Sequence, residues 1–447
     1  MNFADVEVFR SMRGRLHSAY RRGRLGLIDI GSSKITCLVL RIDQARMAEA
    51  EANGQRGTAL LGAVEVVGAR TVQSRGIRRG EIVDMEEVCR AIRLALLNAE
   101  KMAAPRVERV DQVVVSFSGG RPASHMTEAQ IDIETGQVTD HDLSDVLAAC
   151  PMPPMDQDRQ ILHAQPCEIT IDHQAGISDP RGMMARTLSV ALHVLSIDRK
   201  ALADVTECVR RCDLDLAGVV SSAYASAMSA LVEDEQRAGA ICVDMGAGST
   251  SAGIFLRDHL VCVDQVRYGG ANVTNDIAAG LMMSQSHAER IKTLFGGVVS
   301  TGADDREMID APKIGEEDLP ERRQISRGML IGVIRPRIEE ILLMLRSRLD
   351  EIGVGEMPGS ALVLTGAVCQ TPGIDELVAR TFGRRPRIGR PLRIAGLPNA
   401  LSGPDFAAVV GLAIYALHPH DELWDFEAPR GSRGRATEMF RWLRRAW

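Results

Sequence analysis

The sequence has few aromatic residues and no apolar run of the length that crosses a membrane. Only 4% of its 447 residues are aromatic, and no apolar stretch approaches the roughly 18 residues that a membrane span needs. Residues 1–24 have acidic side chains early and no apolar core, which argues against a secretory signal. We therefore expect no membrane-spanning segment.

The cysteine spacings of disulfide frameworks and zinc sites are also missing. The nine cysteines include no Cys-x-x-Cys pair and no cluster with histidine at zinc spacing. We expect reduced thiols and a cytosolic protein with no directly bound metal. A net charge of −6 argues against nucleic acid as a partner. With 45% hydrophobic residues, the chain is long enough for two or more compact cores.

Two familiar phosphate motifs, the P-loop and the Gly-x-Gly-x-x-Gly fingerprint, are missing as well. A different glycine pattern occurs twice instead. Residues 27–34 read LIDIGSSK, and residues 241–250 read ICVDMGAGST. In each, a strand-like run leads to an Asp-x-Gly turn and a second strand-like run follows. A hairpin that recurs about half a chain later predicts two similar domains facing each other.

The two turns have the chemistry of a phosphate site. Glycine allows a close approach to a ligand, successive backbone N–H groups attract oxyanions, and hydroxyl groups add donors. Asp29 and Asp244 would repel phosphate unless a hydrated Mg2+ lay between them, because Mg2+ keeps waters and binds through carboxylates and phosphates. An ordinary hairpin turn is the alternative for each motif alone. The predicted phosphate-binding residues are Gly31, Ser32, Ser33, Lys34, Gly246, Ala247, Gly248, Ser249 and Thr250.

Two more segments are candidates for the same site. Residues 361–367 read as a strand that ends in the small-residue turn Gly366-Ala367. Glu289 and Lys292 are three apart in a predicted helix and share one face, which suits ribose hydroxyls or an adenine edge. A plain surface ion pair is the alternative for Glu289 and Lys292.

The C-terminal tail gives a second, independent signal. All three tryptophans lie within the last 24 residues. A helix over 435–447 would place aromatic and aliphatic side chains on one face and arginines on the other, which is typical of an interfacial membrane helix. A helix that docks on protein is the alternative. The predicted residues for binding anionic lipid are Met439, Phe440, Arg441, Trp442, Leu443, Arg444, Arg445 and Trp447.

These segments together resemble the actin-like ATPase superfamily and, within it, the FtsA family of bacterial cell-division proteins. The resemblance runs over residues 24–447. It implies that the turns at Asp29 and Asp244 are the two phosphate motifs of an ATP site with Mg2+. It also implies that Gly366 and Ala367 form the adenosine motif, with Glu289 and Lys292 as ribose and adenine contacts. Ala247 and Ala367 stand where the family has glycine, and an alanine at positive φ would be strained.

The fold implied by the resemblance is α/β and actin-like, with duplicated ribonuclease H-like domains, an inserted subdomain and a C-terminal amphipathic helix. The first domain (1A) is expected at 24–83 and 180–225, and the inserted subdomain (1C) at 84–179. The second domain (2A) is expected at 226–285 and 352–417, and its subdomain 2B at 286–351. Residues 1–23 read as a basic extension, either disordered or a second membrane contact. Residues 418–434 read as a flexible linker, and 435–447 as the membrane helix.

The function implied by the resemblance is that of an adaptor at the division site. Such a protein binds ATP and polymerises into a filament on the cytoplasmic face of the inner membrane, as a peripheral membrane protein. It tethers the C-terminal peptide of the tubulin-like protein FtsZ and recruits later division proteins through 1C. The candidate residues for the FtsZ peptide, with a solvated helix face as the alternative, are Arg322, Arg323, Arg327, Arg335 and Arg337.

No residue of the sequence can be named as a catalytic base, so a weak ATPase is the most that we expect. Two other functions fit the same superfamily. One is a pilus-assembly adaptor, and the other is a small-molecule kinase.

Overall fold

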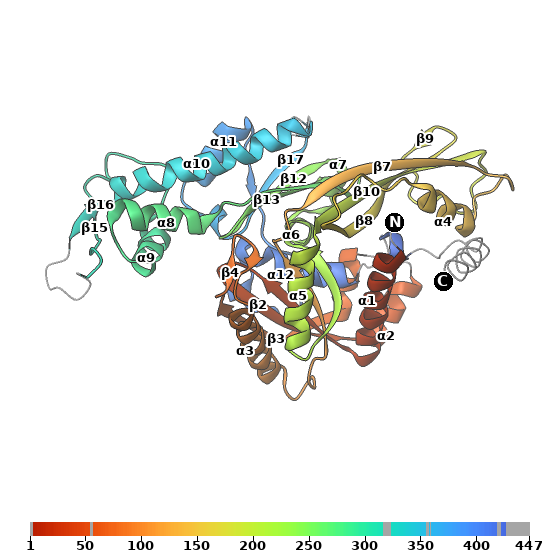
Figure 1. Ribbon diagram of the computed structural model, residues 1–447, viewed down its shortest axis with the longest axis horizontal. Coiled ribbons are helices and arrows are strands. Elements are labelled where there is room, and N and C mark those ends of the chain that lie inside the picture. Colours follow the sequence, from red (N-terminus) through yellow and green to blue (C-terminus); the bar gives the residue numbers. More distant parts are fainter. Residues whose placement is uncertain are drawn as a thin grey trace, which may run out of the picture.

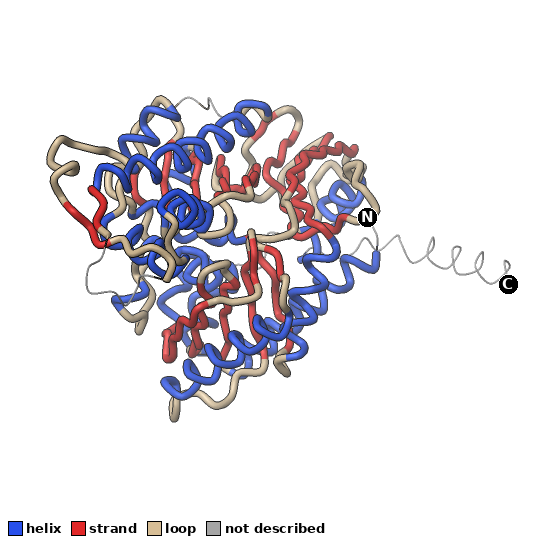
Figure 2. The backbone as a smooth tube through the Cα atoms, turned by 60° about the vertical axis from the view of Figure 1, so that its left-hand side comes forward, coloured by secondary structure: helices blue, strands red, loops and turns tan. Residues whose placement is uncertain are grey.

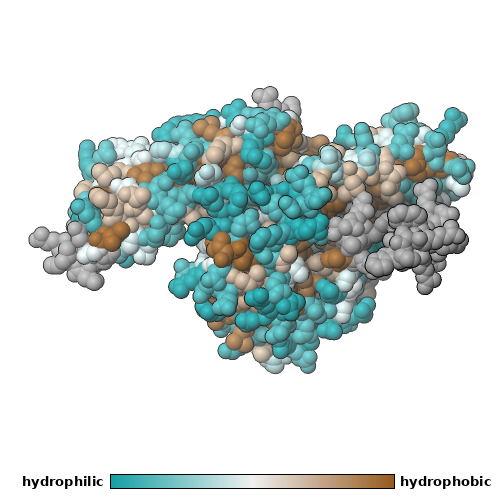
Figure 3. All heavy atoms as spheres, in the orientation of Figure 1, coloured by the Kyte–Doolittle hydropathy of each residue, from teal (hydrophilic) through white to brown (hydrophobic). Residues whose placement is uncertain are grey.

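The computed structural model describes residues 3–53, 57–315, 323–354, 357, 359–417 and 422–425. The chain forms two lobes built on five-stranded sheets, with a third sheet extending to one side (Figure 1). Helices flank the sheets (Figure 2). The face seen in Figure 3 is mostly hydrophilic, with small scattered hydrophobic patches.

The first sheet has its motif hairpin at the centre. Strand β1 pairs antiparallel with β2 and parallel with β6. Helices α3 (Met85–Ala103) and α5 (Arg199–Arg211) pack their apolar sides into the first domain's core. The strands in order across the sheet are β11 (Asp215–Ser221), β6 (Gln112–Phe117), β1 (Arg24–Ile30), β2 (Lys34–Ile42) and β3 (Val64–Gln73).

The second sheet repeats the same arrangement. Strand β12 pairs antiparallel with β13 and parallel with β17, as β1 does with β2 and β6. The duplication predicted from the repeated motif is therefore confirmed. The strands in order are β14 (His259–Val266), β13 (Thr250–Leu256), β12 (Ala240–Met245), β17 (Ala361–Thr365) and β18 (Arg387–Ile388).

Two helices, α6 (Ser222–Ala230) and α12 (Ala407–Leu417), pack against each other between the sheets. Helix α12 is apolar on all sides, as expected for a helix surrounded by protein. Its Val409 and Leu412 share one core with Leu27 of the first sheet and Phe255 of the second. Helix α12 was predicted to be part of the second domain (226–285 and 352–417), but it packs on β1, β2 and β6 of the first sheet and on α6.

The inserted subdomain is a four-stranded sheet with one helix, α4 (Asp140–Ala149). The strands in order are β7 (Ala123–Asp132), β10 (Thr187–Asp198), β8 (Arg159–Ile171) and β9 (Gln174–Ala175). The predicted boundaries of 84–179 are wrong at both ends. Residues 85–117 form α3 and β6 of the first domain, and β10, assigned to the first domain, pairs with both β7 and β8.

Within its described residues, subdomain 2B contains three helices, which pack together: α8 (Gly270–Leu281), α9 (Gln285–Phe295) and α10 (Arg327–Glu351). Helix α8 precedes the predicted start of 2B at residue 286. The other elements are α2 (Gln44–Ala52), η1 (Gly57–Ala63), β4 (Ile77–Arg78), β5 (Glu81–Ile82), α7 (Glu233–Ala238), β15 (Met308–Asp310), β16 (Gln324–Ser326), η2 (Val368–Gln370), α11 (Ile374–Phe382), η3 (Asn399–Leu401) and η4 (Pro404–Phe406).

The N-terminal extension, predicted to be disordered, forms helix α1 (Phe3–Arg22). The prediction of disorder is therefore wrong. Phe9, Met12 and Leu16 recur at helical spacing, and the helix is held in place because these three side chains are buried. Phe9 stacks on Trp424, with ring centroids 4.3 Å apart. Trp424 belongs to the short turn η6 (Leu423–Asp425), inside the predicted linker.

Glu422, next to this turn, is also buried. Its carboxylate lies 2.7 Å from His163 Nδ1 and accepts a hydrogen bond of 2.9 Å from the Ala164 N–H. Residues 422–425 are therefore packed against β8 and α1, in contrast to the predicted flexible linker. The rest of the predicted linker and the predicted membrane helix lie outside the described residues.

Candidate functional site

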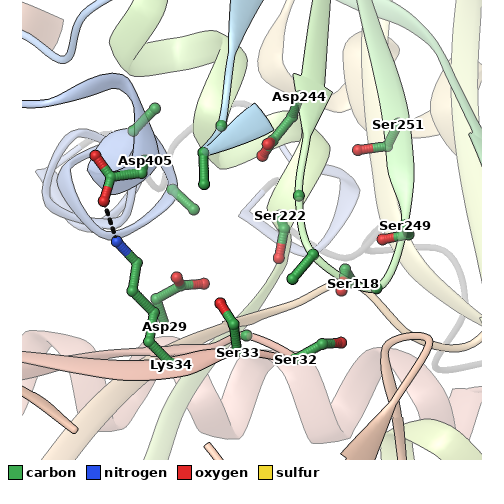
Figure 4. Close-up of a pocket in the computed structure, with 18 of the residues that line it drawn as sticks. Asp29, Ser32, Ser33, Lys34, Ser118, Ser222, Asp244, Ser249, Ser251 and Asp405 are labelled. Atoms are coloured by element: carbon green, nitrogen blue, oxygen red, sulfur yellow. Dashed lines mark hydrogen bonds and ion pairs between the residues drawn. The ribbon is translucent and has the colours of Figure 1, made fainter. Parts of the chain in front are cut away.

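The turns of the two motif hairpins meet at one cavity between the domains. Asp29 and Asp244 both line this cavity (Figure 4). So do most of the predicted phosphate-binding residues and the predicted adenosine turn. The predicted residues that line it are Asp29, Gly31, Ser32, Ser33, Lys34, Asp244, Gly246, Ala247, Gly248, Ser249, Gly366 and Ala367.

The two turns have the same backbone geometry. The Gly31 N–H donates to the Lys34 carbonyl at 3.1 Å, and the Gly246 N–H donates to the Ser249 carbonyl at 3.0 Å. Asp29 and Asp244 each stand two residues before the turn glycine. They are therefore equivalent positions in the two domains, and they approach the cavity from opposite walls.

Two glycines at the cavity are required by close packing. A Cβ at Gly248 would lie 2.2 Å from Ser32 Oγ, because the second turn touches the first. A Cβ at Gly366 would lie 2.4 Å from Asp244 Oδ1, and the φ of Gly366 is +84°. A side chain at either position would push apart groups that the fold brings together.

The Asp29 carboxyl group is set deep in the cavity and hydrogen bonded. Burial raises its pKa to about 6, and the neighbouring Asp244 carboxylate adds to the rise. The Ser116 hydroxyl donates to Asp29 Oδ1 at 2.8 Å, and this bond and the Lys34 ammonium oppose the rise in the pKa.

The Asp244 carboxyl group has a similar environment with a different donor. Burial raises its pKa, whereas the Ser226 hydroxyl, 2.5 Å from Asp244 Oδ2, and the Lys34 ammonium oppose the rise. Two half-buried carboxyl groups on facing walls fit a hydrated divalent cation, because positive charge between them would favour their ionised forms.

Lys34 points away from the turn residues Ser32 and Ser33 (Figure 4). Its ammonium forms an ion pair with Asp405 and lies 3.4 Å from the centroid of the Phe406 ring. Asp405 was missed by the sequence interpretation. The one signal that pointed to it is an acidic residue in a Gly-Pro-Asp turn just ahead of an apolar helix, which is typical of a helix start.

Other lining residues were also missed, because they belong to no recognisable motif. Ser118 follows β6, Ser222 begins α6, Ser251 lies on β13, and Pro404 precedes α12. Ser118 and Ser251 are brought to the cavity by strand pairing, since β6 pairs with β1 and Ser251 lies opposite Asp244. Ser222 and Pro404 are brought there by the packing of α6 and α12.

Three of the residues predicted for the nucleotide site do not line the cavity. Thr250 is buried, and its hydroxyl donates to the Tyr268 carbonyl at 3.0 Å. Glu289 and Lys292 form an ion pair of 2.7 Å, and the Lys292 ammonium also lies 3.2 Å from the Gly270 carbonyl. Both also bond to the Thr274 hydroxyl, which donates to Glu289 at 2.5 Å and lies 2.8 Å from the Lys292 ammonium. Their role as ribose and adenine contacts stays a prediction.

The two alanines at family glycine positions are not strained. Ala367 has φ −67° and ψ −36°, an ordinary right-handed conformation. Ala247 is not among the described residues that have a positive φ. The position in this region that needs positive φ is Gly366, which is a glycine.

The candidate arginines for the FtsZ peptide that are described each have an intramolecular partner. These partners are backbone carbonyl groups for Arg323 and acidic side chains for Arg327, Arg335 and Arg337. Arg322 and the predicted lipid-binding residues lie outside the described part of the chain. Within that part, every helix is too short or too polar to cross a lipid bilayer.

Two sheets of matching strand order, with equivalent aspartates facing one interdomain cavity, define an actin-like fold. Solved structures agree. The PilM–PilN type IV pilus biogenesis complex matches with a TM-score of 0.60 and 16% identity, over 89% of this chain and 100% of that one. MreB5 of Spiroplasma citri bound to ADP matches with a TM-score of 0.50 and 13% identity, over 88% of this chain and 95% of that one.

Sequence comparison identifies the family. Residues 241–411 match the family model "Cell division protein FtsA", and residues 119–196 match "SHS2 domain inserted in FTSA". The FtsA of Agrobacterium fabrum is 36% identical over 100% of both chains. The FtsA of Escherichia coli is 28% identical over 80% of this chain and 86% of the relative. The chain therefore belongs to the FtsA family of cell division proteins.

Proposed function

We propose that this chain is an ATP-binding, actin-like division protein that assembles on the inner membrane and anchors FtsZ at the division site. The observation that carries the proposal is the meeting of Asp29 and Asp244, from equivalent turns, at one cavity. A nucleoside triphosphate with its Mg2+ fits this geometry, because Mg2+ binds through one or two carboxylates together with phosphates.

Different residues of the cavity would bind the phosphates, the Mg2+ and the adenosine. Backbone N–H groups and hydroxyls of the two turns would hold the phosphates. Asp29 and Asp244 would hold hydrated Mg2+, which when bound offsets the negative charge of the phosphates. The turn at Gly366 and Ala367 would contact the adenosine. We assign no catalytic base, so hydrolysis would be slow at most.

Equilibrium binding of a fluorescent ATP analogue with Mg2+ tests the nucleotide site. Asp244→Asn should weaken binding about tenfold or more, the size expected for losing one charged hydrogen-bonding group. Asp111→Asn is a matched control, because it removes an exposed carboxylate that pairs with Arg22 outside the cavity. Equal affinities for the native chain and Asp244→Asn would refute the proposed site.

Membrane attachment is proposed for the last 13 residues, 435–447. One such anchor would bind weakly, and assembly of many copies would raise the avidity by about 10² to 10⁴. Pelleting with vesicles that contain anionic lipid should fall sharply when residues 435–447 are deleted. Unchanged pelleting of the truncated chain would refute the anchor.

FtsZ binding is proposed for subdomain 2B, and recruitment of later division proteins for 1C. Arg335 is more accessible than Arg327 and Arg337, with 42% of its side chain exposed against 21% and 26%, and its pair with Glu339 is long, at 3.9 Å. Arg335→Ala should weaken binding of the FtsZ C-terminal peptide, measured by fluorescence anisotropy. Binding that is unaffected by this change would remove Arg335 from the proposed surface.

A pilus-assembly adaptor has a comparable fold, as the PilM match shows. The 36% identity to a division protein over the whole chain favours division over that alternative and over a small-molecule kinase.

A further inference from the structure

Lys34 is the one lysine or arginine that lines the cavity within the described part of the chain. It is already engaged there. Its ammonium pairs with Asp405, and 22% and 20% of the two side chains are exposed. The Lys34 ammonium also lies over the face of the Phe406 ring, with Nζ 3.4 Å from the ring centroid. The cation is therefore held by a carboxylate and an aromatic face at the start of α12.

Asp405 is itself held in place from the second domain. Its Oδ1 accepts a hydrogen bond of 3.3 Å from the Gln370 side chain, next to the turn at Gly366 and Ala367. The preceding residue, Pro404, accepts at its carbonyl from the Thr365 hydroxyl at 2.9 Å and from the Gly366 N–H at 3.1 Å. The position of the carboxylate is thus set by the second domain, while Lys34 belongs to the first.

We propose that Asp405 is a positioning residue that competes with the nucleotide phosphates for Lys34. The inference rests on the proposed function, and it concerns how that site is regulated. When a triphosphate enters, the Lys34 ammonium exchanges the Asp405 carboxylate for a phosphate oxygen, and the contact between Lys34 and the start of α12 is lost. No covalent bond changes in this step. Asp405 therefore lowers nucleotide affinity and couples phosphate binding to the interdomain helix.

A double-mutant cycle on nucleotide binding tests the competition. In the native background, Asp405→Asn should tighten binding of the MgATP analogue about three- to tenfold, since a partly exposed ion pair is replaced by a weaker contact. Lys34→Met should weaken binding. In the Lys34→Met background, Asp405→Asn should change the affinity less than twofold, because the competed cation is absent.

The cycle separates this role from plain repulsion between Asp405 and phosphate. Repulsion alone predicts the same tightening in both backgrounds, and that result would overturn the inference. No change or a loss of affinity in Asp405→Asn would also overturn it. Asp111→Asn, with the same change of charge, is the control for net charge.

Ligand-free stability gives a second readout. Asp405→Asn and Lys34→Met should each lower the melting temperature without nucleotide, and the double variant should be no less stable than either one. Additive losses would mean that the two groups do not act as a pair. If the native chain and all variants bind no nucleotide, the proposed function fails together with this inference. If the native chain binds but the cycle shows no coupling, only this inference fails.

Discussion

The two motif hairpins share a backbone but differ in how their aspartates are hydrogen bonded. Asp29 lies opposite Ser116 in the first sheet and accepts from that serine. Asp244 lies opposite Thr365 in the second sheet, but the Thr365 hydroxyl donates to backbone carbonyls instead. The Asp244 carboxylate accepts its hydrogen bond from Ser226 on α6. The first carboxylate is thus oriented within its own sheet, and the second is oriented by an interdomain helix.

The turns themselves also differ in composition. The first presents Ser32, Ser33 and Lys34, which offer hydroxyl groups and a positive charge. The second presents Ala247 and Gly248, which allow the two turns to touch. The two hairpins thus share the main-chain geometry and the position of the aspartate. Their neighbouring side chains differ: those of the first turn offer polar groups, and those of the second are small enough for contact between the turns.

The largest expected effect comes from removing the charge of Asp29, the half-buried aspartate of the first hairpin. The folded-state pKa of Asp29 is raised from 3.8 to about 6, so ionisation favours the unfolded chain. The native protein should therefore lose stability as the pH rises from about 4 to 6, by up to about 3 kcal/mol. Asp29→Asn should be more stable than the native chain at pH 8 by up to that amount, and equally stable at pH 4.

Denaturant unfolding at the two pH values measures this difference. Asp244→Asn should likewise be more stable than the native chain at pH 8, because burial raises the pKa of Asp244 as well. A stability difference between Asp29→Asn and the native chain that does not depend on pH would contradict the assigned burial.

The next effect concerns the contact between the turns. Gly248→Ala should cost about 2 kcal/mol of stability, because its Cβ would overlap Ser32. The equivalent position in the first turn is Ser33, and Ser33→Gly should change stability by well under 1 kcal/mol. Thermal unfolding of the two variants sharpens the comparison. Equal losses would mean that the turns do not touch as described.

A smaller effect is expected from the hydroxyl donors. Ser116→Ala and Ser226→Ala should each cost about 1 kcal/mol, and each should raise the pKa of the aspartate that it serves. Thr365→Val should leave the pKa of Asp244 in place, because its hydroxyl points to carbonyl groups. Carboxyl titration by NMR distinguishes the three variants. A shift of the Asp244 pKa in Thr365→Val would contradict the asymmetry between the hairpins.

The smallest effect is expected at the adenosine turn. Ala367→Gly should lower stability by about 0.5–1 kcal/mol, because glycine gains freedom in the unfolded chain. It should not tighten nucleotide binding, since Ala367 already has an unstrained φ of −67°. Tighter binding of the fluorescent analogue by Ala367→Gly would show that the alanine impairs the site.

The sequence was sufficient to predict the duplicated hairpins and their shared cavity, because the motif residues are local and repeat in order. It did not reveal Asp405 or Ser222, whose places depend on how α12 and α6 pack between the domains. The boundary of 1C was misjudged because α3 and β6 follow one another like any helix and strand, and only pairing assigns β6 to β1. Helix α1 packs on β11 and β1 of the first sheet, and its Phe9 stacks on Trp424, more than 400 residues away. Such contacts between distant segments are not visible in the local sequence pattern.

The central claim is that both hairpins close on one metal–nucleotide. Mn2+ in place of Mg2+, titrated with ATP and the full chain and followed by electron paramagnetic resonance, tests it directly. We predict one Mn2+–ATP per chain in the native protein, with much weaker binding in both Asp29→Asn and Asp244→Asn. Retention of the native signal by either single variant would contradict the claim.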